Sequence, residues 1–489
     1  MTTPITPSEF QQRIFGFVKD RAPAKKHGIV NAVAGSGKTT TLELASKLLP
    51  VDGLFCAFNK HIAESLAKRL NGRMRATTIH SIGMSALYSG LGTRPQVDDS
   101  KYWTIIREYM LSAPRDLKAE DKAVSRLNQM VRFARLTLTD YTDLDRLLIM
   151  ANRYGVEWSD HIAAAVAPII DRGRLVAKET GMIDFTDMLS LPHYLNLRPR
   201  SYPFVFVDEC QDLSSAGLEL VMKCIQSGGR SLWVGDPCQS IMQFAGADSQ
   251  SYAAIRERTD AVELPLSICY RCPTTVINLA RDIVPHIQAR PNAPAGAVRQ
   301  VNEDALLGAR EGDLIMSRRN APLVKHCLRL IRKGVQARVR GRDIGEELAD
   351  TVNEIGGRLT RYFDLPHAVE KYRTHHTKLL DAANARDDQF EMLADTCDAI
   401  LECFTGFSDC KSVGDLARKI ESIFSDVNAA IWFSSVHRAK GLEADRTFIL
   451  GYDSLGRARA SASVEQAQQE RNLKYVSITR AKAIMHKVS

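Results

Sequence analysis

The sequence lacks the features of an exported or membrane-embedded protein. Its first residues, MTTPITPSEF, contain no basic stretch followed by an apolar run, so no secretory signal is expected. The longest apolar stretch, Ile162 to Ile170, has about half the length that a membrane-spanning helix needs. The ten cysteines have no regular spacing, which indicates reduced thiols and not a disulfide framework. We therefore expect a cytoplasmic location.

The sequence also lacks the ligand spacing of a structural zinc site. Cys269 and Cys272 form one close pair, and Cys397, Cys403 and Cys410 are spaced more loosely. Structural zinc needs four ligands, and no second close pair of Cys or His stands at finger spacing. Free, buried cysteines are the better interpretation.

The composition is that of an ordinary folded chain with a mild excess of positive charge. Hydrophobic residues make up 45% of the 489 residues, and charged residues 25%. A chain of this length has room for roughly three domains. The formal net charge is +8, which is compatible with a polyanionic partner but is also common among other enzymes.

One segment has the pattern of a phosphate-binding loop. From Gly28 the chain reads GIVNAVAGSGKTTTLELASKLLP, in which a β-branched run leads into two glycines and then a helical pattern. Lys38 would reach the β- and γ-phosphates, and the Thr39 hydroxyl would bind Mg²⁺. Ala32 departs from the simplest motif, which has Gly there, and the alternative is a glycine-rich turn before a helix. The loop residues expected around the phosphates are Ala34, Gly35, Ser36, Gly37, Lys38, Thr39 and Thr40.

A second segment supplies the carboxylates that such a loop needs. Residues 204–212 read FVFVDECQD, which places Asp208 and Glu209 at the end of a buried strand. Asp208 is the expected Mg²⁺ partner, and Glu209 is placed to activate the attacking water. The stretch SLWVGDPCQS ends in Asp236 and Gln239, and GLFCAFNK is a fourth strand. Parallel strands that alternate with helices predict a doubly wound α/β domain with its site at the carboxyl edge. Asp236 is also suited to cap a helix, and both roles stay open.

The order of these segments resembles the superfamily 1A DNA helicases, the UvrD-, Rep- and PcrA-like motors. The resemblance extends along the whole chain, and the FNK…TIHS wording favours a compact, phage-type or F-box-helicase-like branch. Ser435 stands where the family usually has Thr. The segments that carry it are EFQQRIF, AFNKHIAESL, TTIHSIG, IDFTDML, VDECQD, VGDPCQSIMQFAGA, CYRCP, SVHRAKGLEADRTFIL and QERNLKYVSITRAK.

The resemblance implies an ATP site built from two motor domains. Gln11, with Gln12 as the alternative, would read adenine, and Gln239 would sense the γ-phosphate. Planar, permanently charged guanidinium groups suit a transferring phosphate, and arginine is the family's choice. The second motor domain would contribute Tyr270 stacked on adenine, Arg271 and Arg480 directed at the γ-phosphate, and Glu443 near the ribose.

The resemblance also implies a path for single-stranded DNA. In the coupling segment QSIMQFAGA, Met242 replaces the usual aromatic residue and Ala245 replaces a polar one. Phe244 would remain as a platform for base stacking, or alternatively be a core residue. The basic run 325–342 is interpreted as a helix and a strand with a solvated face, with direct DNA contact as the alternative. The expected DNA contacts are Phe58, Asn59, Thr78, His80, Phe244 and His437.

The expected architecture is two RecA-like P-loop motor domains, each with a helical insertion. In the family's nomenclature these are 1A with insertion 1B, and 2A with a reduced insertion 2B. The predicted bounds are 1–90 and 181–265 for 1A, 91–180 for 1B, 266–350 and 429–489 for 2A, and 351–428 for 2B.

These expectations describe an ATP- and Mg²⁺-dependent translocase and helicase that acts on single-stranded DNA and DNA junctions. We expect a monomer whose protein partners belong to replication or repair. The family implies 3′→5′ polarity. One alternative is a translocase that strips proteins from single strands with little unwinding, which the short second insertion favours. Another is a nucleotide-switched DNA-binding regulator, which would not need a water-activating glutamate.

Overall fold

The chain folds into two compact units, Met1–Ser267 and Ile268–Ser489, in a computed structural model. Each unit is described separately below. The residues that the structure describes are 6–20, 22–49, 52–57, 59–70, 74–120, 122–242, 246, 250–357, 359–382, 387–426, 429–458 and 464–489.

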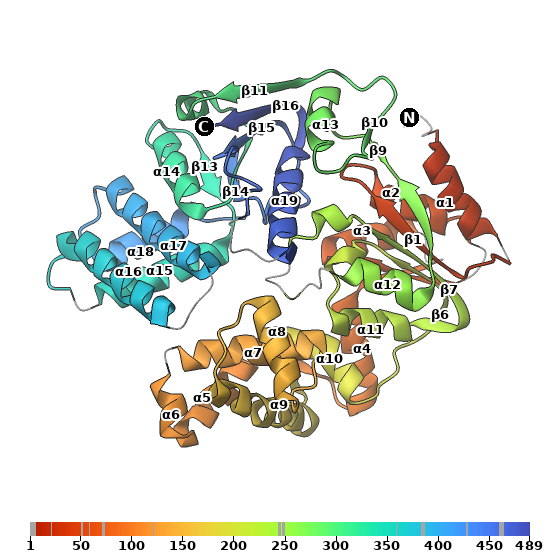
Figure 1. Cartoon of the computed structure of the whole chain (residues 1–489), viewed down its shortest axis with the longest axis horizontal. Helices are drawn as coiled ribbons and strands as arrows, with labels where there is room; N and C mark the ends of the chain where they lie inside the picture. The colour runs from red at the N-terminus through yellow and green to blue at the C-terminus, as the bar shows by residue number, and fades with distance from the viewer. Residues whose placement is uncertain are drawn as a thin grey trace. The chain divides into compact units, whose positions relative to one another are not determined.

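The first unit is built on a six-stranded parallel sheet (Figure 1). Its strand order is β3-β2-β6-β7-β1-β8, so every loop that follows a strand emerges at the same edge. The inner strands are largely buried and contain β-branched and aromatic residues, as in Tyr202–Val207. The strands are β1 (His27–Ala32), β2 (Gly53–Ala57), β3 (Met74–Thr78), β6 (Tyr202–Val207), β7 (Ile225–Gly235) and β8 (Val262–Leu266).

Helices cover this sheet and connect its strands. The helices are α1 (Glu9–Lys19), α2 (Lys38–Ser46), α3 (Lys60–Arg69), α4 (Ile79–Leu91), α10 (Phe185–Tyr194), α11 (Ser215–Lys223) and α12 (Ser251–Thr259), with short 3-10 turns η1 (Cys210–Asp212) and η2 (Pro237–Gln239).

A helical insertion with its own core separates β3 and α4 from α10 and β6 (Figure 1). Buried residues of several of its helices, among them Ile106, Leu127 and Ile169, form one cluster. Two short strands, β4 (Gln96–Val97) and β5 (Met182–Ile183), pair where the chain enters and leaves the insertion. The helices are α5 (Lys101–Ser112), α6 (Arg115–Ala119), α7 (Ala123–Thr137), α8 (Leu144–Tyr154) and α9 (Asp160–Thr180).

The second unit contains another six-stranded parallel sheet, in the order β11-β16-β15-β12-β14-β13. The two α/β units with parallel sheets confirm the predicted fold class. The elements of this unit outside its helical segment are β9 (Ile268–Cys269), α13 (Thr274–Ala280), β10 (Gln288–Ala289), β11 (Ala297–Val301), η4 (Glu303–Gly308), β12 (Leu314–Ser317), α14 (Asn320–Ile331), β13 (Ala337–Val339), β14 (Ile431–Ser435), β15 (Ala444–Leu450), α19 (Val464–Ile478) and β16 (Ala481–Val488).

The predicted start of the helical segment of the second unit lies within a continuous helix. The boundary placed between residues 350 and 351 falls inside α15, which runs from Arg342 to Gly356 without a break. The segment also shares one core with the sheet domain, because Cys327 and Leu328 of α14 pack in the same cluster as Cys403. Its further elements are η5 (Tyr362–Asp364), α16 (Leu365–Ala382), α17 (Asp387–Gly406) and α18 (Val413–Ile423). The division into four domains otherwise stays a prediction.

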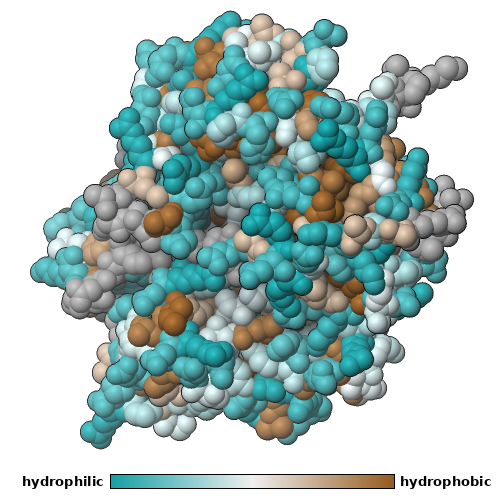
Figure 2. Space-filling model, turned by 45° about the vertical axis from the view of Figure 1, so that its right-hand side comes forward, coloured by the Kyte–Doolittle hydropathy of each residue, from teal (hydrophilic) through white to brown (hydrophobic). Residues whose placement is uncertain are grey.

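The cysteines form no disulfide bonds, as their irregular spacing predicts. All ten cysteines are free thiols, and Cys238 is the only one that is not buried. Within the part of the chain that the structure describes, no helix is both long and apolar enough to span a membrane. The face in Figure 2 is mostly hydrophilic, with hydrophobic residues in small separate groups.

Candidate active site

The glycine-rich loop joins β1 to α2 in a conformation that suits a bound anion. Gly35 and Gly37 have φ angles of 68° and 77°, which residues with a side chain rarely adopt. Helix α2 has no side-chain cap at its N-terminus and no acidic residue in its first turn. The hydroxyl of Ser36 is buried and has no hydrogen-bond partner among the described residues. Uncapped N–H groups and an unsatisfied hydroxyl fit a phosphate group.

Thr39 and Asp208 face one another from α2 and the end of β6. The Thr39 hydroxyl donates a 2.6 Å hydrogen bond to Asp208 Oδ2. Burial, and then the negative charge of Glu209, raise the pKa of Asp208 to about 6. Magnesium in nucleotide sites uses one or two protein oxygens together with phosphates and water, so these two residues fit it. The described residues contain no group of three or more His, Cys, Asp or Glu that would hold a metal without a nucleotide.

Lys38 lies among three carboxylates. Its Nζ is 2.9 Å from Glu209 Oε2. Burial alone would lower the pKa of Lys38, but the charges of Glu209, Asp236 and Asp208 raise it above its ordinary value. Lys38 is therefore a cation at neutral pH, and the surrounding carboxylates hold it at the loop.

Glu209 has a backbone conformation that few non-glycine residues adopt, with φ 52° and ψ 41°. Its carboxylate accepts a 2.6 Å hydrogen bond from Gln211 Nε2 as well as the contact from Lys38. Gln211 also accepts a hydrogen bond of 3.0 Å from the backbone N–H of Asp236. Gln211 therefore joins the ends of β6 and β7 and orients Glu209, a role that we did not predict although the residue lies within VDECQD.

Asp236 caps the turn η2 and also faces the predicted site. Its carboxylate accepts from the Cys238 N–H at 3.0 Å and from Gln239 Nε2 at 2.6 Å. Burial raises the pKa of Asp236, while the charge of Lys38 opposes the rise. The cap is thus present, and it fixes the side chain of Gln239 next to the carboxylate cluster.

The two candidate adenine readers differ in their surroundings. Gln11 is buried, accepts a hydrogen bond from the Ser8 N–H at 3.0 Å, and donates to the Thr41 hydroxyl at 3.0 Å. Gln12 is exposed and donates to the carbonyl of Pro7. Gln11 alone is tied to helix α2, which makes it the better candidate.

In the second unit, two of the predicted nucleotide contacts pair with each other. Arg271 Nε donates to Glu443 Oε2 at 2.6 Å, and Arg271 Nη1 donates to the carbonyl of Thr479 at 3.2 Å. Tyr270 is exposed, with 40% of its surface accessible. Sequence reasoning missed the Arg271–Glu443 ion pair because its members are far apart in the chain.

Arg480 is almost entirely buried, with 1% of its surface accessible. Its guanidinium donates to the carbonyl of Val476 at 2.9 Å, to the carbonyl of Leu442 at 3.3 Å and to the Thr479 hydroxyl at 3.1 Å. These bonds fix the side chain at the end of α19. Its contact with a γ-phosphate stays a prediction.

The basic run 325–342 forms helix α14, strand β13 and the start of α15. Several of its charges have acidic partners, such as Lys325 with Glu303 at 3.0 Å and Arg329 with Asp304 at 3.0 Å. The structure thus agrees with the interpretation as a helix and a strand of the second motor domain.

Five of the six predicted DNA contacts fall into three groups, and the sixth, His80, is described separately. Phe58 and Phe244 lie outside the described residues. Asn59 and Thr78 cap helices α3 and α4 by accepting from backbone N–H groups at 2.9 Å and 3.2 Å. Burial, and then the charge of Arg318, lower the pKa of His437 to about 3, so this residue is neutral at physiological pH.

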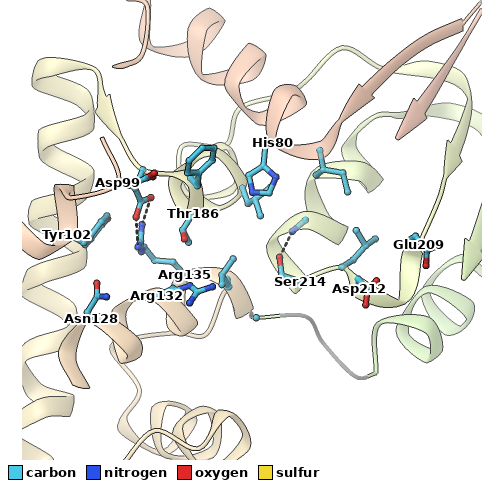
Figure 3. Close-up of a pocket in the computed structure, with 18 of the residues that line it drawn as sticks. His80, Asp99, Tyr102, Asn128, Arg132, Arg135, Thr186, Glu209, Asp212 and Ser214 are labelled. Atoms are coloured by element: carbon cyan, nitrogen blue, oxygen red, sulfur yellow. Dashed lines mark hydrogen bonds and ion pairs between the residues drawn. The ribbon is translucent and has the colours of Figure 1, made fainter. Parts of the chain in front are cut away.

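His80 lines a cavity of about 390 Å³ within the first unit. Figure 3 shows Glu209 and Asp212 at one end of this cavity, Tyr102 and Asn128 at the other, and His80 between them. The cavity also contains Phe185 and Trp103, which are 52% and 38% exposed, and Arg132. Exposed aromatic rings beside a basic side chain are the features that bind single-stranded nucleic acid.

We did not predict these cavity residues individually. The signal for Phe185 was present in IDFTDML, but periodicity does not show whether its ring is exposed or buried. Trp103 and Arg132 lie in the helical insertion, where the sequence carries no motif.

Comparison with known proteins agrees with this arrangement. Residues 19–260 match the UvrD/REP helicase N-terminal domain, and residues 413–486 match the UvrD-like helicase C-terminal domain. The ATP-dependent DNA helicase PcrA of Staphylococcus epidermidis (strain ATCC 35984) is 24% identical over 280 residues, which are 54% of this chain and 38% of that protein. PcrA of Staphylococcus aureus (strain Mu50) is 24% identical over 276 residues, 52% of this chain and 37% of that protein.

The matches thus span less than two fifths of the length of these curated relatives. Both family models nevertheless describe halves of one kind of protein, and they match in the expected order along the chain. The chain belongs to the UvrD-like helicases of superfamily 1A.

Proposed function

We propose that this protein hydrolyses ATP and uses the energy to move along single-stranded DNA and to separate duplex strands. The observation that carries the proposal is the group formed by Lys38, Thr39, Asp208 and Glu209 at one edge of the sheet, with hydrogen bonds and ion pairs of 2.6–2.9 Å. This is the set of residue types that phosphoryl transfer to water needs.

Each of these residues has a distinct task. Lys38 binds the β- and γ-phosphates once it leaves Glu209, and Thr39 and Asp208 would hold the magnesium ion. That ion, when bound, neutralises charge on the phosphate oxygens. Glu209 then orients the attacking water and accepts its proton, while Gln211 keeps the carboxylate in place by its 2.6 Å hydrogen bond.

We assign Arg271 and Arg480 to the stabilisation of the γ-phosphate, with Tyr270 stacked on adenine and Glu443 near the ribose. The hydrogen bonds of Arg271 and Arg480 to Thr479 support a shared function, because one residue orients both guanidinium groups. Gln11 and Gln239 complete the nucleotide contacts.

The DNA substrate is proposed from the family and from the cavity. The relatives that match are named as ATP-dependent DNA helicases. His80, together with the exposed Phe185, offers rings on which bases can stack. We extend the path to Phe58, Asn59, Thr78, Phe244 and His437 by resemblance, and we propose 3′→5′ polarity and action as a monomer on the same ground.

Two measurements test this function. ATP hydrolysis should rise several-fold when oligo(dT) is added, and a 3′-tailed duplex should be unwound in preference to a 5′-tailed one. Equal ATPase rates with and without DNA would reject the motor. Unwinding of the 5′-tailed duplex alone would reverse the polarity.

A translocase that displaces proteins with little unwinding is the second candidate. The helical segment of the second unit favours it, because this segment shares a core with α14 instead of forming a separate body. DNA-stimulated ATPase and release of a bound protein, without strand displacement from either tailed duplex, would identify this activity.

A further inference from the structure

Four buried charges join the helical insertion to helix α10. Lys101 of α5 and Arg135 of α7 come from the insertion, whereas Asp184 and Asp187 belong to the start of α10. The exposed fraction of each residue is below a tenth. Two cations and two anions make a neutral group, which we call the buried charge cluster.

The two aspartates first define the start of their own helix. Asp184 Oδ1 accepts from the backbone N–H of Asp187 at 2.6 Å, and Asp187 Oδ2 accepts from the backbone N–H of Asp184 at 3.2 Å. This reciprocal capping box fixes the backbone on either side of Phe185.

The same carboxylates bind the two cations of the insertion. Lys101 Nζ lies 2.5 Å from Asp187 Oδ2. Arg135 donates from Nη1 and Nη2 to the two oxygens of Asp184 at 2.9 Å and 2.8 Å, and also from Nη1 to Asp187 at 3.0 Å. The Arg135 guanidinium lies over the Tyr102 ring at 3.6 Å (Figure 3 labels both residues).

Tyr102 and α10 also pack against other helices, α9 and α4 respectively. A Cβ on Gly173 of α9 would lie 2.2 Å from the Tyr102 hydroxyl, so this helix packs directly against the ring. A Cβ on Gly83 of α4 would lie 1.7 Å from the Met188 carbonyl, so α4 and α10 are in backbone contact. Helix α10 is thus held by α4 on one side and by the charge cluster on another.

Arg135 and Asp184 line the cavity themselves, and the other two members of the cluster are close in sequence to residues that line it. Lys101 precedes Tyr102 and Trp103, Asp184 and Asp187 flank Phe185 and Thr186, and Arg135 is one helical turn from Arg132. The cluster therefore sets the distance between the wall that carries Trp103 and Arg132 and the wall that carries Phe185.

An apolar core would join the two parts at a lower desolvation cost, because burying charges costs free energy that their attraction only partly returns. Charge pairs instead impose one arrangement, since a shift of either partner leaves a buried charge unpaired. A fixed arrangement is useful where the two walls of the cavity must bind one substrate together.

We propose that Lys101, Arg135, Asp184 and Asp187 are positioning residues that hold the walls of the cavity at the separation at which Phe185, Trp103 and Arg132 bind single-stranded DNA together. This inference rests on the proposed function. It assigns to the two aspartates of IDFTDML a role in DNA affinity and not in ATP chemistry.

The test uses the full-length protein with Arg135→Lys, Lys101→Met, Asp187→Asn and the double variant Lys101→Met/Asp187→Asn. Arg135→Lys keeps the charge but loses the two-pronged contact with Asp184. The double variant removes both members of one ion pair, so that no unpaired charge stays buried. Lys325→Met, which breaks an exposed ion pair in the second unit, is the matched control.

For each protein, the melting temperature, the ATPase rate without DNA and the oligo(dT) concentration for half-maximal stimulation are measured. We expect the double variant and Arg135→Lys to raise the half-maximal concentration by about tenfold, as the loss of one stacked base would. Their ATPase rate without DNA should stay within about twofold of the wild type, because Glu209 lies at the opposite end of the cavity from Tyr102, over which Arg135 lies (Figure 3). Lys325→Met should match the wild type in all three measurements.

The outcomes separate this inference from the proposed function. If the double variant and Arg135→Lys fold and respond to oligo(dT) as the wild type does, the cluster is merely structural and the inference is wrong. If ATPase falls equally with and without DNA, the cluster does not act on DNA affinity and the inference is also wrong. If the wild type itself does not respond to oligo(dT), the proposed function fails and the inference fails with it.

Discussion

The hydroxyl of Thr39 donates a 2.6 Å hydrogen bond to the carboxylate of Asp208, and this bond joins the phosphate-binding loop to the neighbouring strand β6. The two residues are far apart in the sequence. They meet because β1 and β6 lie in one parallel sheet with β7 between them, so that the loops after these strands share an edge.

We expect the buried carboxylate of Asp208 to lower the free energy of unfolding at neutral pH. Its pKa is about 6, compared with 3.8 ordinarily, so the folded state favours the protonated carboxyl. The stabilisation of the folded state by the protonated carboxyl is fully present below about pH 4 and is lost as the pH rises through about 6. Asp208→Asn should therefore raise the free energy of unfolding at pH 7.5 by up to about 3 kcal/mol and leave it nearly unchanged at pH 4.

Urea denaturation at the two pH values, without nucleotide or magnesium, measures this difference. The same variant should lose ATP hydrolysis in magnesium. A variant that is less stable than the wild type at pH 7.5 would show that the Thr39–Asp208 contact stabilises the fold and that the burial of Asp208 is not a cost.

Glu209→Gln should separate binding of ATP from its hydrolysis. The substitution removes the proton acceptor, so kcat should fall by about 10²–10⁴-fold. It also releases Lys38 from its 2.9 Å ion pair, so ATP should bind at least as tightly as to the wild type. ATPase assays and titration with a fluorescent ATP analogue measure the two effects.

Glu64→Gln is the control for Glu209→Gln, because this exposed glutamate of α3 forms a loose ion pair of 3.9 Å with Lys60. It should leave both quantities unchanged. A Glu209→Gln protein with wild-type kcat would assign water activation to another group.

Gln11→Ala tests the choice between the two candidate adenine readers. Since the amide of Gln11 is fixed by Ser8 and Thr41, its loss should lower kcat/KM for ATP more than for GTP. Gln12→Ala should change neither value, because the side chain of Gln12 is exposed and donates to the carbonyl of Pro7, outside α2. Equal losses with both nucleotides would mean that Gln11 only supports helix α2.

The Arg271–Glu443 pair predicts a graded series of ATPase rates. Arg271→Ala should lower kcat most, and an arginine directed at the transferring phosphate is worth about 10³–10⁵ in rate. Arg271→Lys should be intermediate, because lysine keeps the charge but loses the planar fork. Glu443→Gln should have the mildest effect, since Arg271 keeps its bond to the Thr479 carbonyl. If Glu443→Gln were as slow as Arg271→Ala, the ion pair itself would be the essential element.

The sequence predicted the parts of the site that depend on short segments. The loop at Gly35 and Gly37, the strand before Asp208 and the cap at Asp236 all follow from local patterns, and the structure contains each of them. The family resemblance is confirmed by the two family models. The branch within the family stays a prediction.

The parts that the sequence did not predict depend on contacts between distant segments. Lys101 and Asp187 become partners only when the insertion packs against helix α10. Arg271 and Glu443 become partners only when distant segments of the second unit fold together. The predicted bound at residue 350 falls inside α15, whose buried residues pack in the core shared with the sheet domain and show no change of pattern there.

In the proposed function, binding of single-stranded DNA is coupled to ATP hydrolysis at Lys38, and one measurement tests this coupling most directly. ATP hydrolysis is followed with increasing oligo(dT) for the wild type and for Lys38→Ala. We predict a saturable, several-fold rise in the wild type and no hydrolysis by Lys38→Ala at any DNA concentration. A wild-type rate that does not change with oligo(dT), or a rate that survives in Lys38→Ala, would contradict the account.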